Sequence, residues 1–475
     1  MAQCELDYDT IVVGAGPSGL TLATYLPGRT LVLERDATIG GIHKVRRDVE
    51  GYFSEHGPRV YSGTFYNFKR VLQDIGLPWD QVFAPAQFSP QLIDGKNWYR
   101  WLSVREVSVL VLHFMLMAIN PSHGKNVTMQ DMCRAYGFSD RSCRYIDAVC
   151  RFSDGAGADR YSLHEFLHGF SDHGKGFFEP RKANDKLLFP HWQRFLEGRG
   201  VQIKLATPVA KVEHRCGRVT GVSVTVGKEV KSYTAPRVVM AIPPENAAAL
   251  LRASGLKEPG YATFSRATRY EEYFCVTYHF PSDAAPLVTH AGLRSTPWGL
   301  VYMEMSKYMS GEATAFISVA ASQLRVRSPR TGKTVHESTR PEAIAEILRQ
   351  LPIADDLKAR LVKAVPSSCL QRTKDMWVNI DKAYIYSARY PGGWPATLGC
   401  CRGLHNVGCQ NGLSWYPFTS FESAVGNALI FLGQREIVPW TVLTVLRLLP
   451  VLLLLAWAAR FAWRRRRLLR CRARR

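Results

Sequence analysis

Short apolar runs separated by glycine-rich turns open the chain and predict a strand-helix-strand unit. Ile11-Val12-Val13 is a β-branched run with no polar alternation, as is typical of a parallel strand buried on both faces. Thr30–Leu33 repeats this pattern, and the residues between the two runs favour a helix that begins near Pro17-Ser18. Apolar strands that alternate with helices indicate the α/β class.

The same kind of pattern returns in the second half of the chain. Beyond residue 187 we expect a helix at 192–197, a strand at 201–205, a hairpin at 208–224 and a strand at 237–244. Residues 270–280 alternate like a half-buried antiparallel strand. Further strands at 299–303 and 315–319, with helices at 65–76 and 341–351, complete a mixed α+β pattern.

Two stretches are unusually apolar. Val104–Ile119 ends in 13 nearly uncharged residues, too few to span a bilayer. We expect it to be a core helix with His113 packed inside, the alternative being a helix that dips one face into a membrane. Residues 438–459 are 22 residues long, enough for a tilted span in spite of Arg447 and Pro450. A helix lying in the membrane interface is the alternative.

The charge and the cysteine content of the chain limit the classes of partner that we expect. The net charge is +21, but eight arginines fall in the last twelve residues, so the rest of the chain is less strongly basic. No recognisable nucleic-acid module is present, which favours an anionic cofactor and an anionic membrane surface as partners and predicts no nucleic-acid binding. The 11 cysteines form no CxxC pair or zinc-finger spacing, so we expect no metal site and a reduced chain.

The turn after the first strand carries a nucleotide-binding pattern. Gly14, Gly16 and Gly19 have the G-x-G-x-x-G spacing, in which glycines permit the tight turn, backbone approach to a pyrophosphate and close helix packing. The helix that begins at Pro17-Ser18 would direct its N-terminal N–H groups at the phosphates. Glu34 follows the second strand, 20 residues after Gly14, where an acid reaches the ribose hydroxyls.

The residues that follow make the pattern more specific. A glutamate separated by five residues from the Gly40-Gly41 pair, followed by an aromatic strand and the turn Gly57-Pro58-Arg59, resembles the flavin-containing amine oxidoreductase superfamily. That group includes monoamine oxidases, protoporphyrinogen oxidases, carotenoid desaturases and UDP-galactopyranose mutases. The resemblance implies FAD as the cofactor, with Arg35 beside Glu34, the double glycine and the 57–59 turn around it.

Two later segments extend the resemblance. Val209 occupies the position whose backbone bonds the adenine in the family, and residues 404–428 are similar to its C-terminal signature. The resemblance implies that Gly408, Phe421 and Glu422 bind the cofactor and that the following helix directs its N-terminus at the flavin. Cys409 replaces the usual acid and Ser423 the usual glycine, two departures from the family.

The family pattern predicts a Rossmann-like FAD-binding domain with an inserted α+β substrate domain and a C-terminal membrane helix. The expected FAD-binding domain is discontinuous, with segments 1–75, 186–250 and 395–435. The substrate domain comprises residues 76–185 and 251–394. A membrane helix at 436–463 and a polybasic tail at 464–475 follow.

Catalytic side chains are harder to assign because the flavin itself accepts the electrons. Lys382 is our candidate for the lysine that assists flavin reoxidation in amine oxidases. The aromatic cage of those enzymes does not transfer, because Ser420 stands where its second tyrosine should be.

The sequence therefore predicts a membrane-associated FAD-dependent oxidoreductase that transfers a hydride from a C–N or C–C bond of a small apolar substrate to flavin N5. The alternatives are a UDP-galactopyranose mutase-like flavoenzyme and a non-catalytic, membrane-tethered FAD-binding protein. With no signal peptide before the first strand, we expect a tail-anchored protein with its catalytic domain in the cytosol. The mitochondrial outer membrane is favoured over the endoplasmic reticulum, and the lipid bilayer is the expected partner of the C-terminal helix and arginine cluster.

Overall fold

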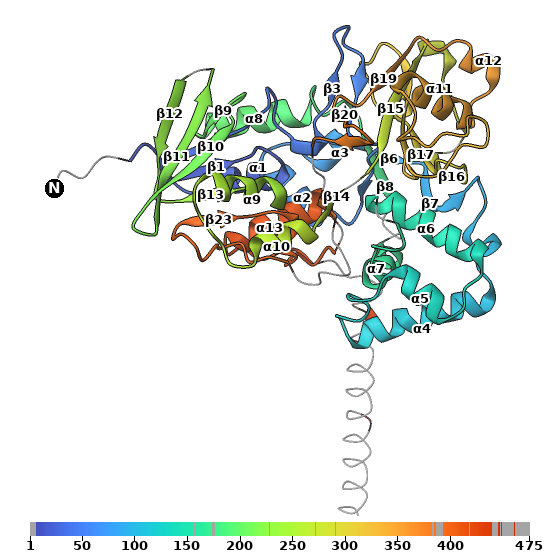
Figure 1. The fold of residues 1–475 in the computed structure, drawn as a ribbon, viewed down its shortest axis with the longest axis horizontal. Helices are drawn as coiled ribbons and strands as arrows, with labels where there is room; N and C mark the ends of the chain where they lie inside the picture. The colour runs from blue at the N-terminus through green and yellow to red at the C-terminus, as the bar shows by residue number, and fades with distance from the viewer. Residues whose placement is uncertain are drawn as a thin grey trace, which may run out of the picture.

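The computed structural model describes residues 6–438, apart from 156, 173–175, 228, 271, 290, 382–383, 386–392 and 418, together with residues 445, 446, 448 and 460. Figure 1 shows a parallel sheet with its helices on one side of the molecule and a larger, mostly antiparallel sheet on the other. A group of helices lies below the second sheet.

The parallel sheet joins strands that are far apart in the chain. Its spatial order is β23 (Leu404–Asn406), β13 (Val238–Met240), β1 (Thr10–Val13), β2 (Thr30–Leu33) and β9 (Gln202–Lys204). These strands come from three separate segments, which lie within the three predicted segments of the FAD-binding domain. All pairs are parallel, so the carboxyl ends of the strands meet at one edge of the sheet.

Both faces of this sheet are covered, which explains why its strands are apolar throughout. Val12 and Val32 face a core shared with four helices: α1 (Pro17–Tyr25), α2 (Tyr66–Asp74), α8 (Leu188–Gly198) and α13 (Phe421–Phe431). Ile11 and Leu31 face the opposite core. That core is closed by the sheet of β10 (Val209–Arg215), β11 (Arg218–Val226) and β12 (Glu229–Thr234), with α9 (Pro244–Ala253) and α10 (Tyr261–Ala267).

The second sheet has six strands. Their order is β19 (Lys363–Pro366), β15 (Phe274–Phe280), β18 (Ala315–Ala321), β17 (Leu300–Glu304), β16 (Ala291–Arg294) and β7 (Phe88–Ile93). α11 (Arg340–Gln350) packs on it, and the short α12 (Asp355–Lys358) follows. The half-buried strand predicted from residues 270–280 is wrong in one respect, because every residue of β15 is buried. β15 lies between β18 and β19 with other elements on both faces, so its polar members Thr277 and His279 are buried too.

Short strand pairs connect these parts. They are β3 (Arg46–Arg47) with β4 (Phe53–Ser54), β5 (Tyr61–Ser62) and β6 (Phe83–Ala86) with β8 (Phe177–Pro180), β14 (Arg269–Tyr270) with β22 (Tyr384–Ile385), and β20 (Leu370–Arg372) with β21 (Trp377–Asn379). The short helix α3 (Trp79–Val82) leads into β6.

The helical group contains α4 (Val104–Ile119), α5 (Met129–Ala135), α6 (Asp140–Asp154) and α7 (Leu163–Asp172). The helix expected at residues 104–119 is present with those bounds. Its expected place in the core is wrong, because a row of its apolar side chains faces solvent. His113 is buried, as expected.

The predicted membrane helix falls almost wholly outside the described residues; of residues 438–459, only 438, 445, 446 and 448 are described. Within the described part of the chain, no helix combines the length and the apolar character that a bilayer crossing requires.

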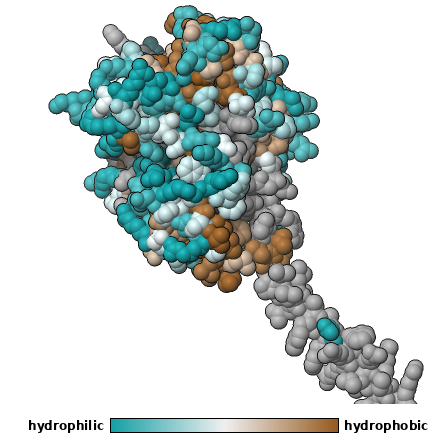
Figure 2. Space-filling model, turned by 90° about the vertical axis from the view of Figure 1, so that its right-hand side faces the viewer, coloured by the Kyte–Doolittle hydropathy of each residue, from teal (hydrophilic) through white to brown (hydrophobic). Residues whose placement is uncertain are grey.

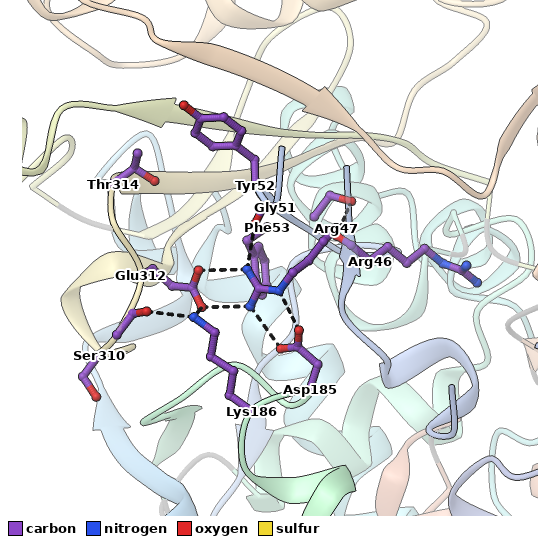
Figure 3. Close-up of polar contacts among 12 residues, drawn as sticks. Arg46, Arg47, Gly51, Tyr52, Phe53, Asp185, Lys186, Ser310, Glu312 and Thr314 are labelled. Carbon is purple, nitrogen blue, oxygen red and sulfur yellow. Dashed lines mark hydrogen bonds and ion pairs between the residues drawn. The ribbon is translucent and has the colours of Figure 1, made fainter. Parts of the chain in front are cut away.

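An ion-pair network holds β3 against the six-stranded sheet (Figure 3). The guanidinium of Arg47 donates to both oxygens of Asp185 at 2.6 and 3.2 Å and to both oxygens of Glu312 at 2.9 and 3.0 Å. Lys186 also binds Glu312 at 2.7 Å. Because Glu312 follows β17 and Arg47 follows the double glycine, the network joins the two halves of the fold.

We expect the Arg47→Met variant to be less stable to urea by about 2 kcal/mol, because partly buried carboxylates lose charged hydrogen-bond donors. The matched control is Arg29→Met, which removes an exposed arginine whose Asp9 partner is also exposed. Equal midpoints for the two variants would show that the network contributes nothing to stability.

Candidate functional site

A cavity of about 460 Å³ opens at the carboxyl ends of β1, β2, β13 and β23. This edge of a parallel sheet is the usual ligand position in α/β folds. Gly14, Gly16, Pro17 and Ser18 form one wall, and residues 241–253 form another. The predicted cofactor residues that line the cavity are Gly14, Gly16, Pro17, Ser18, Glu34, Arg35, Gly41, Arg59, Val209 and Gly408.

The glycine turn has the geometry that a phosphate loop needs. Gly14 has a φ of +102°, and a side chain there would press on the carbonyl of Ala241. A Cβ on Gly19 would lie 1.9 Å from the carbonyl oxygen of Gly14, so only glycine lets α1 begin this close to the turn. Gly19 thus shapes the loop from behind without lining the cavity. The N-terminus of α1 is directed at the cavity and favours an anion there.

Glu34 and Val209 lie at one end of the cavity. The buried Glu34 carboxylate accepts hydrogen bonds from the backbone N–H of Ala15 at 2.8 Å and of Asp36 at 3.0 Å. It therefore fixes the glycine turn while its side chain lines the cavity. Arg35 donates to Asp381 at 2.6 Å. Val209 begins β10 beside Thr207 and Pro208 in the same wall.

The C-terminal segment forms the opposite wall. β23 leads through Gly408 and Cys409 to α13, whose first turn also lines the cavity. Ser420 caps α13 by accepting from the Ser423 N–H at 3.1 Å, and Ser423 returns a bond by accepting from the Ser420 N–H at 2.9 Å. The serine that replaces the family glycine therefore completes a capping box. Burial raises the pKa of Cys409, so the thiol is neutral where the family has an acid.

Three side chains present buried polar atoms to the cavity without a partner in the described residues. They are Arg59, through Nε and Nη2, His43, through Nδ1, and Thr419, through its hydroxyl. Burial and the neighbouring Arg59 lower the pKa of His43 well below its usual value, so its imidazole is neutral. Unpartnered buried polar groups are costly. Their presence in three separate segments fits a polar cofactor that would complete their hydrogen bonds.

The carboxyl group of Glu55 lies near Arg59, and that of Glu179 lies near Glu55. Burial raises the pKa of Glu55 to about 7, although Ser318 and Arg59 oppose the shift. Burial and Glu55 raise the pKa of Glu179 well above its usual value, and neither of its oxygens has a hydrogen-bond partner in the described residues. Glu179 is therefore neutral at physiological pH. The pKa of Glu55 near 7 leaves this carboxyl partly ionised, so it compensates the charge of Arg59 only in part.

Six predicted cofactor residues are not part of the cavity lining. They are Gly19, Gly40, Gly57, Pro58, Phe421 and Glu422. Gly40 has a φ of +115° and packs against the ring of Phe189, while Gly41 beside it lines the cavity. Gly57 is buried beside Cys275 and Tyr273. The glycines thus bring the backbone to the cavity rather than contact its contents.

Glu422 and Phe421 require a correction to their predicted placement at the cofactor. The buried Glu422 carboxylate accepts from the backbone N–H groups of Asn67 and Phe68, both at 2.9 Å, and so caps α2. Phe421 stacks on Phe68 with ring centroids 3.9 Å apart. Both side chains fasten α13 to α2 behind the cavity. The pattern placed them on the right helix, but α2 determines their direction.

A cluster of charged side chains was missed by the sequence analysis. Lys44 binds Asp36, and Arg46 binds the buried Asp381. Burial raises the pKa of Asp381, but Arg46, Lys44 and Arg35 outweigh it and hold the pKa below its usual value. Asp36, Lys44 and Asp381 line the cavity. The basic run after Gly41 was the only signal available. Lys382, the catalytic candidate, lies outside the described residues, directly after Asp381.

Comparisons with known proteins agree with this geometry. A family model described as an NAD(P)-binding Rossmann-like domain matches residues 12–75. A second, described as flavin-containing amine oxidoreductase, matches residues 191–352. A search of curated protein sequences found no match.

Solved structures share the fold at low sequence identity. An oxidoreductase from Methanosarcina mazei has a TM-score of 0.63 at 15% identity, over 90% of this chain and 100% of that one. Cyclohexylamine oxidase from Brevibacterium oxydans has a TM-score of 0.61 at 15% identity, over 89% and 97%. Putrescine oxidase bound to putrescine has a TM-score of 0.62 at 13% identity, over 90% and 98%. At these identities the likeness establishes the fold.

Proposed function

We propose that this chain, which belongs to the superfamily of flavin-containing amine oxidoreductases, oxidises a C–N or C–C bond of an apolar substrate at a membrane surface. It is an FAD-dependent oxidoreductase of the amine oxidase-like class. The observation that carries the proposal is one cavity on which two helix N-termini converge with three polar groups that have no partner among the described residues. A polar, anionic cofactor would satisfy all of them.

Different residues of the chain would bind different parts of the cofactor. The N-terminus of α1 at Gly16 and Ser18 would hold the pyrophosphate, and Glu34 with Val209 would hold the adenosine. Arg59, His43, Thr419 and the N-terminus of α13 would surround the flavin end. When bound, FAD supplies the two-electron acceptor. The positive charge of Arg59 and the α13 dipole would stabilise negative charge at the flavin end of the cavity.

The site lacks one of the two tyrosines of the amine oxidase cage, and this bears on the substrate class. Ser420 is the N-cap of α13 and presents a small hydroxyl at the position aligned with the second cage tyrosine of amine oxidases. A small side chain cannot form one wall of an aromatic cage. We therefore favour a flat, apolar substrate without a localised cation, delivered from a bilayer.

Membrane attachment is part of this proposal. The apolar segment at residues 438–459 and the arginines after it would anchor the protein, with the described domains in the cytosol. The outer mitochondrial membrane is the favoured location, and the endoplasmic reticulum is the alternative.

The proposal is tested on detergent-purified full-length protein. We expect the absorption bands of oxidised flavin, release of FAD on denaturation, and anaerobic bleaching by polyenes or porphyrinogens rather than by polar amines. Bleaching by amines alone would overturn the substrate class. Interconversion of UDP-sugars without net bleaching would identify the mutase alternative, and bound FAD that no donor bleaches would favour the non-catalytic one.

Arg59 gives a direct check on the cofactor site. We expect Arg59→Met to bind FAD at least about tenfold more weakly, because a charged hydrogen bond contributes about 1.5–3 kcal/mol. Fluorescence titration of the apoprotein with FAD measures the change. Arg215→Met, at the exposed end of β10, is the matched control and should bind normally. Unchanged affinity in the Arg59 variant would place the flavin elsewhere.

A further inference from the structure

The helix α4 exposes an apolar face to solvent and buries two polar side chains. Six of its eight exposed residues are apolar, among them Val104 at 85%, Leu112 at 51% and Ile119 at 80% exposed, and the other two are Arg105 and Ser108. Exposed apolar residues on α4 recur at helical spacing and form one continuous stripe: Val104, Val111, Leu112, Met115, Leu116 and Ile119. A soluble surface helix places such a stripe against the core.

Two polar side chains of α4, Glu106 and His113, are turned inward, whereas Arg105 and Ser108 are exposed. Glu106 is buried, and its carboxylate accepts from the backbone N–H groups of Ser103 at 2.7 Å and Ser139 at 2.8 Å, and from the Ser142 hydroxyl at 2.8 Å. His113 is buried, and its Nδ1 is hydrogen-bonded to Nε2 of His123 at 2.8 Å. These bonds fix the rotation of the helix, so the apolar stripe cannot turn inward without breaking them.

The surroundings of the stripe suit an anionic lipid surface. Between residues 98 and 144, the exposed charged residues are Arg100, Arg105, Arg134, Arg141 and Arg144 against Asp131 and Asp140. Trp98 and Tyr99 are exposed just before α4, and such amphipathic rings favour the membrane interface. An apolar stripe with an excess of exposed arginines on and near the helix is typical of helices that lie in the headgroup region.

The position of α4 in the molecule favours a bilayer as the partner of the apolar stripe. Figure 1 shows α4 at the lower end of the fold, and Figure 2 shows apolar residues gathered at that end. Leu446, the ninth residue of the apolar C-terminal segment, packs against the hydrophobic core cluster that also contains Leu110 and Met117 of α4. A described residue of the C-terminal segment therefore shares a core cluster with α4.

We propose that α4 is a second membrane contact, which inserts its apolar stripe into the headgroup–acyl boundary of an anionic bilayer. It deepens the membrane attachment proposed above but uses different residues from the C-terminal segment. Two contacts fix the orientation of the domains on the membrane as well as their distance from it.

The test uses the full chain reconstituted in vesicles of phosphatidylcholine and phosphatidylserine that contain a photoactivatable phospholipid. Trypsin cleaves after Arg105 and Lys125, which isolates most of α4 in one peptide. We expect lipid labelling of this peptide and none around Val230, an equally apolar and exposed residue of β12. Labelling of the C-terminal segment without α4 would overturn the inference and leave the tail anchor standing. If neither the α4 peptide nor the C-terminal segment is labelled, both proposed membrane contacts are overturned.

The paired variant Leu112→Glu/Leu116→Glu is expected to reduce labelling of α4 about tenfold or more. The variant loses the favourable transfer of two apolar side chains from water into the bilayer. Retained flavin in this variant checks its fold, and Val230→Glu is the control that should label normally. The other possible occupant is a second copy of the chain. A dimer in detergent that the paired variant converts to monomer would overturn the lipid assignment.

Discussion

Replacing Gly19 with alanine is expected to abolish retention of FAD and to lower the free energy of unfolding by about 3 kcal/mol. The new Cβ would lie 1.9 Å from the carbonyl oxygen of Gly14. A backbone atom cannot move aside as a flexible side chain can, so the glycine turn must shift. That shift displaces Gly16 and Ser18, which line the cavity at the α1 N-terminus.

The flavin-to-protein ratio and the thermal unfolding midpoint measure this effect. Gly198→Ala is the matched control, because α8 ends there and a Cβ would meet nothing within 4 Å. It should be neutral or slightly stabilising. A Gly19 variant that keeps its full complement of FAD would show that the turn is not the phosphate site.

The second large effect is a pH-dependent stabilisation in Glu179→Gln. Burial raises the pKa of Glu179 well above its usual value of 4.5, so the folded protein holds a proton that the unfolded chain releases. Between pH 4.5 and the folded pKa the native state binds more protons than the unfolded state. Stability therefore falls as pH rises, by about 1.4 kcal/mol per pH unit for this group.

Glutamine cannot titrate and so removes that loss. We expect the variant and the parent to be equally stable at pH 4.5 and the variant to be more stable by about 2 kcal/mol or more at pH 8. Urea unfolding at the two pH values measures the difference. Glu229→Gln, on the exposed edge strand β12, should leave the pH profile unchanged. A parallel shift at both pH values would mean that Glu179 is ionised in the folded protein.

Local patterns were sufficient for the nucleotide-binding part of the fold. β1, α1 and β2 lie where the apolar runs and the Gly14–Gly19 spacing predict them. Ten of the predicted cofactor residues line one cavity. These features were predictable because a turn, a helix start and a strand each depend on neighbours within a few residues.

The direction of individual side chains could not be predicted from the sequence. Glu422 lies on the predicted helix, but two N–H groups of α2, more than 350 residues away, turn it from the cavity. Asp381 reaches Arg35 and Arg46 across a similar separation. Glu55 and Glu179 are far apart in the chain, and no local pattern indicates that the two carboxyl groups interact or that Glu179 is buried.

The sequence by itself determined the α/β class, the glycine turn, the position of the cofactor at the strand ends and the apolar character of residues 104–119. The tertiary structure alone decided which face of α4 is buried and which charges surround the cavity. Periodicity shows that a helix has two unlike faces, but only the partners of Glu106 and His113 determine which one meets water or lipid. Such partners are set by long-range packing, which no local pattern records.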